Sequence, residues 1–420
     1  MDVEIVTVGT ELLLGFTVDT NATEISRALA AVGGRVVRRV TVADDRVPLR
    51  DAVAGALRRS RFVVITGGLG PTSDDITKRT VADLFRLPLE LDEEYLRELE
   101  TRFRRHRHRE MPPSNRSQAE APRGAVRLPN PRGTAQGLVI DGPIGTAVLL
   151  PGVPGEMRQI LQDHVVPLVR QRVQVGAGGP AVIRSRTLRT TGVTESGLAD
   201  LLGPLEADLG GVTLAYLPGW EGVDLRLTVW GMDESAADEA LDGAAGTLVA
   251  ALGARYYGAG DRDLAAVVLD SLRESGRTVA VAESCTGGLV GGRLSAVPGA
   301  SDAFVGGVIA YADAAKVTAL GVPTELLDRE GAVSEAVARS MAEGVTRRFA
   351  AAAAIAVTGI AGPTGGTPEK PVGTVWMAAL AGGRTDAVQR IFPGGRDEVR
   401  YRSAQAALDL LRRVLRGESA

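Results

Sequence analysis

The sequence predicts an α/β protein in which a small α+β module separates two α/β domains. Two observations lead to this expectation. Short apolar strands alternate with amphipathic helices towards both ends of the chain, a pattern typical of a mostly parallel sheet covered by helices. The chain also has 420 residues, more than one ordinary hydrophobic core accommodates, so two or three domains are expected.

The composition excludes several classes of protein. With 45% hydrophobic and 24% charged residues, the chain matches an average soluble globular protein and not a disordered one. The acidic N-terminus indicates no signal peptide, and no uninterrupted apolar stretch reaches the ~18 residues of a membrane helix, so a cytoplasmic protein without membrane contact is expected. The single Cys285 rules out an internal disulfide, and the net charge of −3 argues against nucleic acid as the main ligand.

The first domain is expected to span residues 1–172. Apolar runs bounded by glycine and polar residues predict its strands, and apolar residues at helical spacing predict its helices. The expected strands are 3–8, 35–42, 61–66 and 147–150, and the expected helices are 21–31, 47–59 and one that begins at Glu156.

Glycine-rich stretches at 175–180 and 258–261 are the expected joints of the chain. They delimit a middle module at 173–257 and a last domain at 258–420. The expected strands of these two parts are 182–190, 223–230, 278–282, 354–358 and 373–379, and the expected helices are 195–202, 234–252 and 264–275.

The string TGGLGPTSDDITK, residues 66–78, follows a buried strand and leads into a helix expected near Ser73. Glycines let backbone N–H groups approach a ligand closely, and a helix N-terminus favours a phosphate. Asp74 and Asp75 either cap the helix or bind a divalent metal ion (Mg, Mn or Co), and other strand ends converge on the same edge of the sheet. The expected nucleotide-binding residues are Thr66, Gly67, Gly68, Gly70, Thr72, Lys78, Asp19 and Asn21, and the expected metal ligands are Asp74, Asp75 and Glu11.

A second constellation, AESCTGG at residues 282–288, lies at an expected strand-to-helix turn. Ser284 and Cys285 are both possible nucleophiles there. The last domain contains no histidine, which excludes a Ser–His–Asp triad, and its only lysines are Lys316 and Lys370. A Ser–Lys dyad is what this composition permits. The structural alternative is that Ser284 only caps a helix.

Several strings resemble the CinA family of competence- and damage-inducible proteins. The strings VGTELLLG, TGGLGPTSDDIT, NRSQA, NPRGTAQG and LPGVPGEM resemble its N-terminal domain. That domain is similar to molybdopterin-binding proteins of the MogA and MoeA type. Its C-terminal nicotinamide-nucleotide amidase domain is resembled by VAESCTGGLV, GGVIAYADAAKVTALGV and AVTGIAGPTGG, and its KH-type insert by TTGVTES and AYLPG. The resemblance covers nearly the whole chain, in order.

The resemblance implies a bifunctional hydrolase of pyridine-nucleotide salvage. The C-terminal domain would deamidate nicotinamide mononucleotide (NMN) to nicotinic acid mononucleotide and ammonia, without a cofactor. The N-terminal domain would hydrolyse ADP-ribose to AMP and ribose 5-phosphate with the help of a divalent metal ion. The alternatives are a molybdopterin-nucleotide-binding protein and a competence or recombination accessory, both without turnover in the front domain.

The resemblance also implies roles for individual residues of the amidase domain. Ser284 would attack the carboxamide, Lys316 would take its proton, and Tyr311 would orient the base or the substrate. Backbone N–H groups of the glycine-rich turn would stabilise the oxyanion, and cations near the start of the last helix would bind the substrate phosphate. Thr358 is the fourth expected catalytic residue. Arg400 is the first choice for the phosphate-binding cation and Arg396 the second. The other expected substrate-binding residues are Cys285, Thr286, Gly287, Gly288 and Gly359.

Two positions depart from the family pattern. Gln136 stands where the family usually has proline, which is a change within a loop. Asp313 stands where the family usually has asparagine. Its carboxylate lies three residues before Lys316 and is expected to raise the pKa of that lysine.

The middle module contains the letters of a nucleic-acid clamp in Gly219-Trp220-Glu221-Gly222, but in an acidic setting. A spacer or dimerisation module is therefore expected in preference to RNA binding, and the resemblance implies a homodimer.

Overall fold

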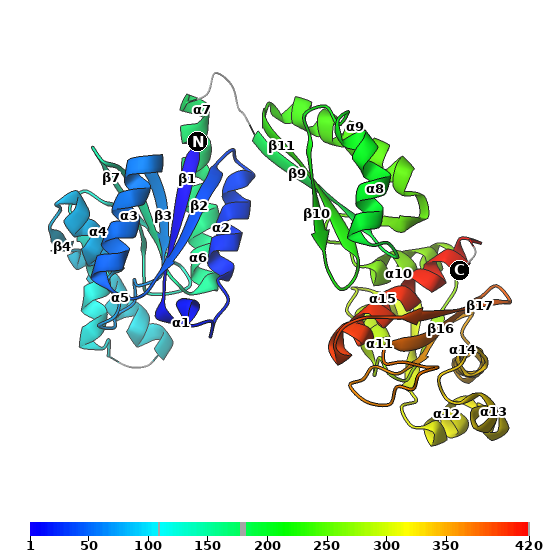
Figure 1. Ribbon diagram of the computed structural model, residues 1–420. Coiled ribbons are helices and arrows are strands. Elements are labelled where there is room, and N and C mark those ends of the chain that lie inside the picture. The colour runs from blue at the N-terminus through cyan, green and yellow to red at the C-terminus, as the bar shows by residue number, and fades with distance from the viewer. Residues whose placement is uncertain (108–109, 177–181, 419–420) are drawn as a thin grey trace. The chain divides into compact units, whose positions relative to one another are not determined.

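The computed structural model describes residues 1–107, 110–176 and 182–418 (Figure 1). The chain forms two compact units, residues 1–184 with 229–239 and residues 185–228 with 240–420. The expected fold class is confirmed, because strands and helices alternate along the described chain and the strands form sheets of six, four and five strands, with a small β4-β5 pair. Among the described helices, none combines the length and the apolar character that crossing a membrane requires.

The first unit is built on a six-stranded sheet with the order β2-β1-β3-β8-β7-β6. The first four of these strands run parallel, and β7 and β6 continue the sheet antiparallel. Every residue of the central strands β3 and β8 is buried, as expected where helices cover both faces. The strands are β1 (Asp2–Val8), β2 (Arg35–Val42), β3 (Phe62–Thr66), β6 (Val126–Leu128), β7 (Gly137–Gly142) and β8 (Gly145–Leu150).

Helices with apolar faces cover both sides of this sheet. One core lies under α2 (Thr20–Ala30), α6 (Pro154–Ile160) and α7 (Val166–Gly176), and the other under α3 (Arg46–Ser60) and α4 (Thr77–Phe85). The remaining elements are α1 (Thr10–Leu13), β4 (Leu89–Leu91), α5 (Glu93–Arg107) and β5 (Glu120–Pro122). Because α7 continues to Gly176, the start of the expected 175–180 joint is helical, and residues 177–180 lie outside the described residues.

The middle module is a four-stranded sheet with the order β10-β11-β9-β12. Alternate residues of β11 are buried, which is the pattern of a sheet covered on one face. Residues 219–222 form the turn of the β10–β11 hairpin and therefore join two strands, not two helices. The elements are β9 (Val182–Thr190), α8 (Glu195–Glu206), β10 (Thr213–Pro218), β11 (Val223–Met232), α9 (Glu234–Leu252) and β12 (Tyr256–Ala259).

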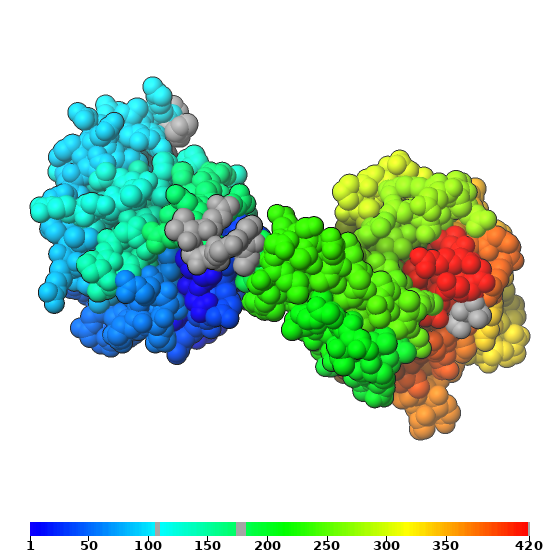
Figure 2. Space-filling model, turned by 90° about the horizontal axis from the view of Figure 1, so that it is seen from above, coloured from blue at the N-terminus to red at the C-terminus, as the bar shows by residue number. Residues whose placement is uncertain are grey.

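The last part of the chain is a five-stranded sheet with the order β14-β13-β15-β16-β17. Its strands are β13 (Val279–Glu283), β14 (Phe304–Ile309), β15 (Ala353–Gly359), β16 (Thr374–Ala381) and β17 (Arg384–Ile391). One face packs on α10 (Leu264–Glu274), α11 (Leu289–Ser295) and α15 (Arg396–Leu415), and the other on α12 (Asp313–Leu320), α13 (Thr324–Glu330) and α14 (Glu335–Phe349). Helices α10 and α15 pack side by side, and the red α15 residues border yellow-green residues in Figure 2.

The strand order places a crevice at one edge of this last sheet. The first strand, β13, lies between β14 and β15 and is parallel to both. The loops that follow these three strands therefore leave the same edge, and those after β13 and β14 lead to helices α11 and α12 on opposite faces of the sheet. Parallel α/β sheets bind ligands at such a point.

Helix α14 crosses the end of α12 at backbone distance. A Cβ atom added at Gly344 would lie 2.0 Å from the Leu320 carbonyl oxygen and 2.9 Å from its carbon. Only glycine permits this close approach. The resulting contact between the two helices positions α12, which carries Lys316.

We expect Gly344→Ala to lower the free energy of unfolding by about 1–3 kcal/mol, because the added methyl group pushes α14 away from α12. The matched control is Gly246→Ala on α9, where an added Cβ meets no atom within 4 Å. That change should be neutral or stabilising by about 1 kcal/mol, since alanine favours a helix. Urea unfolding of both variants is the measurement, and equal stabilities would contradict the close crossing.

Candidate functional site

Ser284 lies directly after β13, at the crevice edge of the last sheet. Its backbone N–H donates to the Val357 carbonyl at 2.9 Å, which fixes it against β15. On the other side, the Ala310 N–H donates to the Glu283 carbonyl at 2.7 Å, which fixes the loop after β14. Ser284 is 7% exposed. The expected nucleophile is thus held between the two strands that flank the crevice.

The Glu283 carboxylate organises the turn that follows Ser284. It is buried and accepts hydrogen bonds from the N–H groups of Gly288, Val290 and Gly291, at 2.9, 3.1 and 2.8 Å. These are the N–H groups that the start of a helix leaves without partners. Sequence reasoning assigned Glu283 no role, although it stands within the AESCTGG string.

This arrangement corrects the expected set of oxyanion donors. The Gly288 N–H is bonded to Glu283, and the Gly287 N–H donates to the Ser284 carbonyl at 3.1 Å. Of the three expected donors, Thr286, Gly287 and Gly288, only the Thr286 N–H donates to no oxygen atom among the described residues, and it interacts with the Cys285 thiol. The Thr286 hydroxyl is also buried without a hydrogen-bond partner in that part of the chain.

Lys316 is buried on α12, beside the same edge. Its Nζ donates to Asp313 Oδ1 at 3.0 Å and to the Tyr311 carbonyl at 3.3 Å. The contact that the sequence predicts between Asp313 and Lys316 is therefore present. No hydrogen bond joins Lys316 to Ser284 among the described contacts. The expected effect on the pKa of Lys316 stays a prediction.

Two arginines at the start of α15 donate hydrogen bonds to the loops at the crevice edge. Arg396 donates to the Tyr311 hydroxyl at 2.8 Å and to the Gly362 carbonyl at 2.6 Å. Arg400 donates to the Thr286 carbonyl at 3.1 Å and pairs with Asp397 at 3.2 Å. The structure therefore brings Tyr311 and both arginines to the edge that carries Ser284.

Thr358 and Gly359 serve the framework of the crevice. The Thr358 hydroxyl donates to the Ala332 carbonyl at 2.8 Å, and the residue is 1% exposed. A Cβ atom at Gly359 would lie 2.6 Å from Val375 Cγ2. Thr358 thus holds the loop before α14, and its hydroxyl is already engaged.

Cys285 points into the hydrophobic core of the last domain. It is 5% exposed, and burial raises the pKa of its thiol to about 12, an effect to which the Glu283 charge adds. A thiol in this state supplies very little thiolate at neutral pH. Ser284 is therefore the better-placed nucleophile of the pair.

The front domain places a second set of predicted residues at the ends of β1 and β3. Gly67 has a φ of +106°, and its added Cβ would lie 2.2 Å from the Val8 carbonyl oxygen. Gly68 has a φ of +65°, and its added Cβ would lie 2.3 Å from Thr77 Oγ1. Both glycines are therefore required by close backbone packing, whatever ligand the turn meets.

The helix expected near Ser73 begins at Thr77 instead. Asp75 accepts hydrogen bonds from the Thr72 N–H at 2.8 Å and from the Thr72 hydroxyl, and this closes a separate turn. Local side-chain bonding of this kind competes with helix formation. Asp74 and Asp75 consequently do not cap α4.

Two different cavities separate the expected metal ligands. One of about 330 Å³ is lined by Gly68, Gly70, Asp75, Gln118, Thr134 and Glu156, and one of about 120 Å³ by Glu11, Asp19, Asn21, Thr66 and Gly67. Glu11 therefore does not join Asp74 and Asp75. In the described part of the chain, no group of three or more His, Cys, Asp or Glu residues is placed to hold a metal ion.

Asp19 and Asn21 in the smaller cavity support the backbone. Asp19 caps α2 by accepting from the Ala22 N–H at 2.9 Å. The Asn21 side chain donates to the Thr66 hydroxyl at 3.2 Å and to the Gly152 carbonyl at 2.8 Å. They thereby tie α2 to β3 and to the loop after β8.

The larger cavity contains a carboxylate that sequence reasoning missed. Glu156, in the first turn of α6, faces the same space as Asp75 and accepts from Asn130 Nδ2 at 2.6 Å. A magnesium ion is commonly held by one or two carboxylates together with substrate phosphates, so this pair fits one. The signal was available, since NRSQA, NPRGTAQG and LPGVPGEM contain Gln118, Thr134 and Glu156.

Lys78 on α4 is partly buried and interacts electrostatically with Asp75, which lines this cavity. It donates to the Ser117 carbonyl, and burial lowers its pKa to about 8, while the charges of Glu120 and Asp75 act in the opposite direction. Lys78 is therefore closer to losing its proton at neutral pH than an exposed lysine.

We expect native Cys285 to resist alkylation by iodoacetamide at pH 8, because its raised pKa leaves very little thiolate and its sulfur is buried. In urea the reaction should reach completion. Since the chain has a single cysteine, intact-mass spectrometry measures the modified fraction directly. Rapid modification of the folded protein would contradict this assignment.

The comparisons with known proteins agree along the whole chain. Three family patterns match in succession, the probable molybdopterin binding domain at residues 4–171, the damage-inducible protein CinA KH domain at 185–258 and the CinA C-terminal domain at 261–415. A CinA-like protein of Gemmatimonas aurantiaca is 52% identical over 420 residues, covering 100% of this chain and 97% of that protein. A putative competence-damage inducible protein of Symbiobacterium thermophilum is 46% identical over 428 residues, covering 99% of each.

A solved structure also matches part of the chain. The competence/damage inducible protein CihA from Agrobacterium tumefaciens is 42% identical, and the match covers 36% of this chain and 93% of that one with a TM-score of 0.35. Because the three patterns follow one another and the relatives match from end to end, the chain belongs to the CinA family.

Proposed function

We propose that the crevice at Ser284 is the active site of a nicotinamide-nucleotide amidase, which converts NMN and water into nicotinic acid mononucleotide and ammonia. The observation that carries the proposal is the position of Ser284 at the switch point of the sheet, under the two arginines of α15. The nucleophile and the cations that a phosphorylated amide requires thus lie at one edge of the sheet. Membership of the CinA family supports the same activity.

In the proposed reaction, Ser284 Oγ attacks the carboxamide carbon and its proton passes to Lys316. Lys316 returns this proton to the amide nitrogen as the tetrahedral intermediate collapses, so that ammonia leaves, and water then hydrolyses the ester on Ser284. The Thr286 N–H would donate to the oxyanion. Arg396 and Arg400 bind the substrate phosphate, and Tyr311 is held by Arg396 at the mouth.

Lys316 has two possible roles, and they make opposite demands. As a base it must lose a proton and turn from Asp313 towards Ser284. As a fixed charge it keeps the ion pair to Asp313 and attracts the substrate phosphate. Arginine keeps the charge but does not release its proton near neutral pH, so one substitution separates the two roles.

We expect Lys316→Arg to lower kcat for NMN deamidation by about 10²–10⁴, the usual loss when a general base is removed. Ser284→Ala should fall at least as far, and Cys285→Ala should keep most activity. The matched control is Lys370→Arg, because Lys370 is the other lysine of this domain and its Nζ donates to the Glu330 carbonyl. Ammonia release under saturating NMN is the measurement. A near-normal kcat for Lys316→Arg would show that Lys316 is not the general base.

We further propose that the front domain hydrolyses ADP-ribose to AMP and ribose 5-phosphate. Asp75 and Glu156 in the larger cavity are the residues that would hold a divalent metal ion, which neutralises phosphate charge when bound. The glycine turn supplies backbone beside that space, and Lys78 adds a cation nearby. The competing proposal is a molybdopterin-nucleotide site without turnover, which the match to the probable molybdopterin binding domain favours.

We expect Asp75→Asn and Glu156→Gln each to abolish ADP-ribose hydrolysis while NMN deamidation stays intact, because each change removes a charge but keeps a hydrogen-bond acceptor. Asp74→Asn, at the exposed neighbour, is the matched control and should keep most activity. Product analysis with and without chelator measures both reactions. Hydrolysis that persists in excess chelator would argue against the metal, and binding without products would support the molybdopterin-type site.

A further inference from the structure

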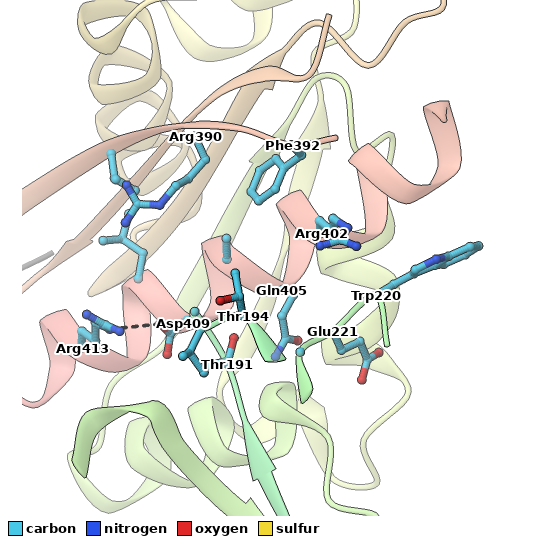
Figure 3. A pocket seen from close by; sticks show the side chains of 16 residues that line it. Thr191, Thr194, Trp220, Glu221, Arg390, Phe392, Arg402, Gln405, Asp409 and Arg413 are labelled. Atoms are coloured by element: carbon cyan, nitrogen blue, oxygen red, sulfur yellow. Dashed lines mark hydrogen bonds and ion pairs between the residues drawn. The ribbon is translucent and has the colours of Figure 1, made fainter. Parts of the chain in front are cut away.

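A cavity of about 290 Å³ lies between the middle module and the last domain, away from the Ser284 crevice (Figure 3). Both walls belong to the second compact unit. One wall comes from the end of β9 and the turn of the β10–β11 hairpin, and the other from β17 and α15. Its volume approaches the roughly 300 Å³ at which small-molecule sites begin, and it far exceeds the ~30 Å³ share of one water molecule.

The floor of the cavity is an unpaired amide. Gln405 on α15 is 3% exposed, and neither its side-chain nitrogen nor its oxygen has a hydrogen-bond partner among the described residues. In Figure 3 the Gln405 side chain extends from α15 into the space bounded by the middle module. A buried amide without partners is costly, so a donor and an acceptor side by side in the cavity would be strongly favoured there.

An aromatic platform stands at the edge of the cavity. Trp220, in the hairpin turn, is 50% exposed, and its ring lies 5.3 Å from that of Tyr401. The contact with Tyr401 holds the indole while leaving half of it free. An exposed, supported indole is the kind of surface on which a heterocyclic base stacks.

Most of the charged side chains that line the cavity form ion pairs, but one arginine does not. Glu221 pairs with Arg189, Asp409 with Arg413, and Arg402 with Glu398. Arg390, at the end of β17, pairs with no carboxylate among the described residues. In Figure 3, Arg390 lies on the side of the cavity away from Trp220. An anionic group is therefore favoured at the Arg390 side.

From these four features we propose that the cavity binds a nucleoside monophosphate. Its base pairs with the Gln405 amide and stacks on Trp220, and its phosphate meets Arg390. Adenine presents an adjacent donor and acceptor on one edge, which is the pattern that a glutamine amide pairs with. The site is separate from both proposed active sites and is independent of their activities.

The test uses the full-length protein labelled with 5-fluorotryptophan. Its three tryptophans give separate ¹⁹F signals, so Trp220 reports on the cavity, and Trp230 and Trp376 are internal controls. Titration with AMP should shift the Trp220 signal in a saturable manner. Adenosine should bind more weakly, and ribose 5-phosphate should leave the signal unmoved. No Trp220 shift with AMP, or an equal shift with ribose 5-phosphate, overturns the proposal.

Gln405→Met separates binding from structure. It keeps the length of the side chain and removes the amide, so AMP affinity should fall by about ten- to a hundredfold while thermal stability stays equal or rises. Gln389→Met, an exposed glutamine outside the cavity, is the matched control. Arg390→Gln should weaken AMP but not adenosine. Unchanged AMP affinity in Gln405→Met overturns the proposal, and so does a loss of stability, which would mean that the amide is already satisfied.

Discussion

The buried carboxylate of Glu283 is the interaction on which the C-terminal site depends. A charge removed from water is costly unless hydrogen bonds replace its hydration, and the first N–H groups of a helix are costly without acceptors. Glu283 and the start of α11 satisfy each other through three hydrogen bonds. Since Ser284 is the next residue, this contact also decides where the proposed nucleophile lies and which N–H groups remain free.

Glycines in both domains serve packing before they serve ligands. Gly67 and Gly68 allow β1 and β3 to end in contact with the turn that leads to α4, and Gly344 allows α14 to touch the backbone of α12. A glycine-rich string is therefore weak evidence for a phosphate cradle by itself. In the front domain, the stronger signal is the pair of carboxylates, Asp75 and Glu156, which face one cavity from distant parts of the chain.

The ion pair between Glu221 and Arg293 joins the middle module to the last domain. Arg189 of β9 pairs with Glu221 and Asp224, and Arg293 of α11 pairs with Asp263 and lies 3.7 Å from Glu221. Glu221 lies in the hairpin turn that has the letters of a nucleic-acid clamp. Its contacts with Arg189 and Arg293 give it a structural role there, because Arg293 belongs to the last domain.

The sequence by itself determined the elements and their class, because the burial of a strand or a helix face leaves a periodic pattern. The resemblance of its motifs to the CinA family also assigned Ser284, Lys316 and the two arginines of α15 to one site. Only the tertiary structure decided the pairs. The Glu283 carboxylate accepts from the Gly288 N–H, and Glu11 lines a different cavity from Asp75. Asp75 and Glu156 line the same cavity, and the amide of Gln405 has no hydrogen-bond partner among the described residues. Each of these contacts depends on the distance in space between residues that are far apart or differently oriented along the chain, and the local sequence pattern does not contain that distance.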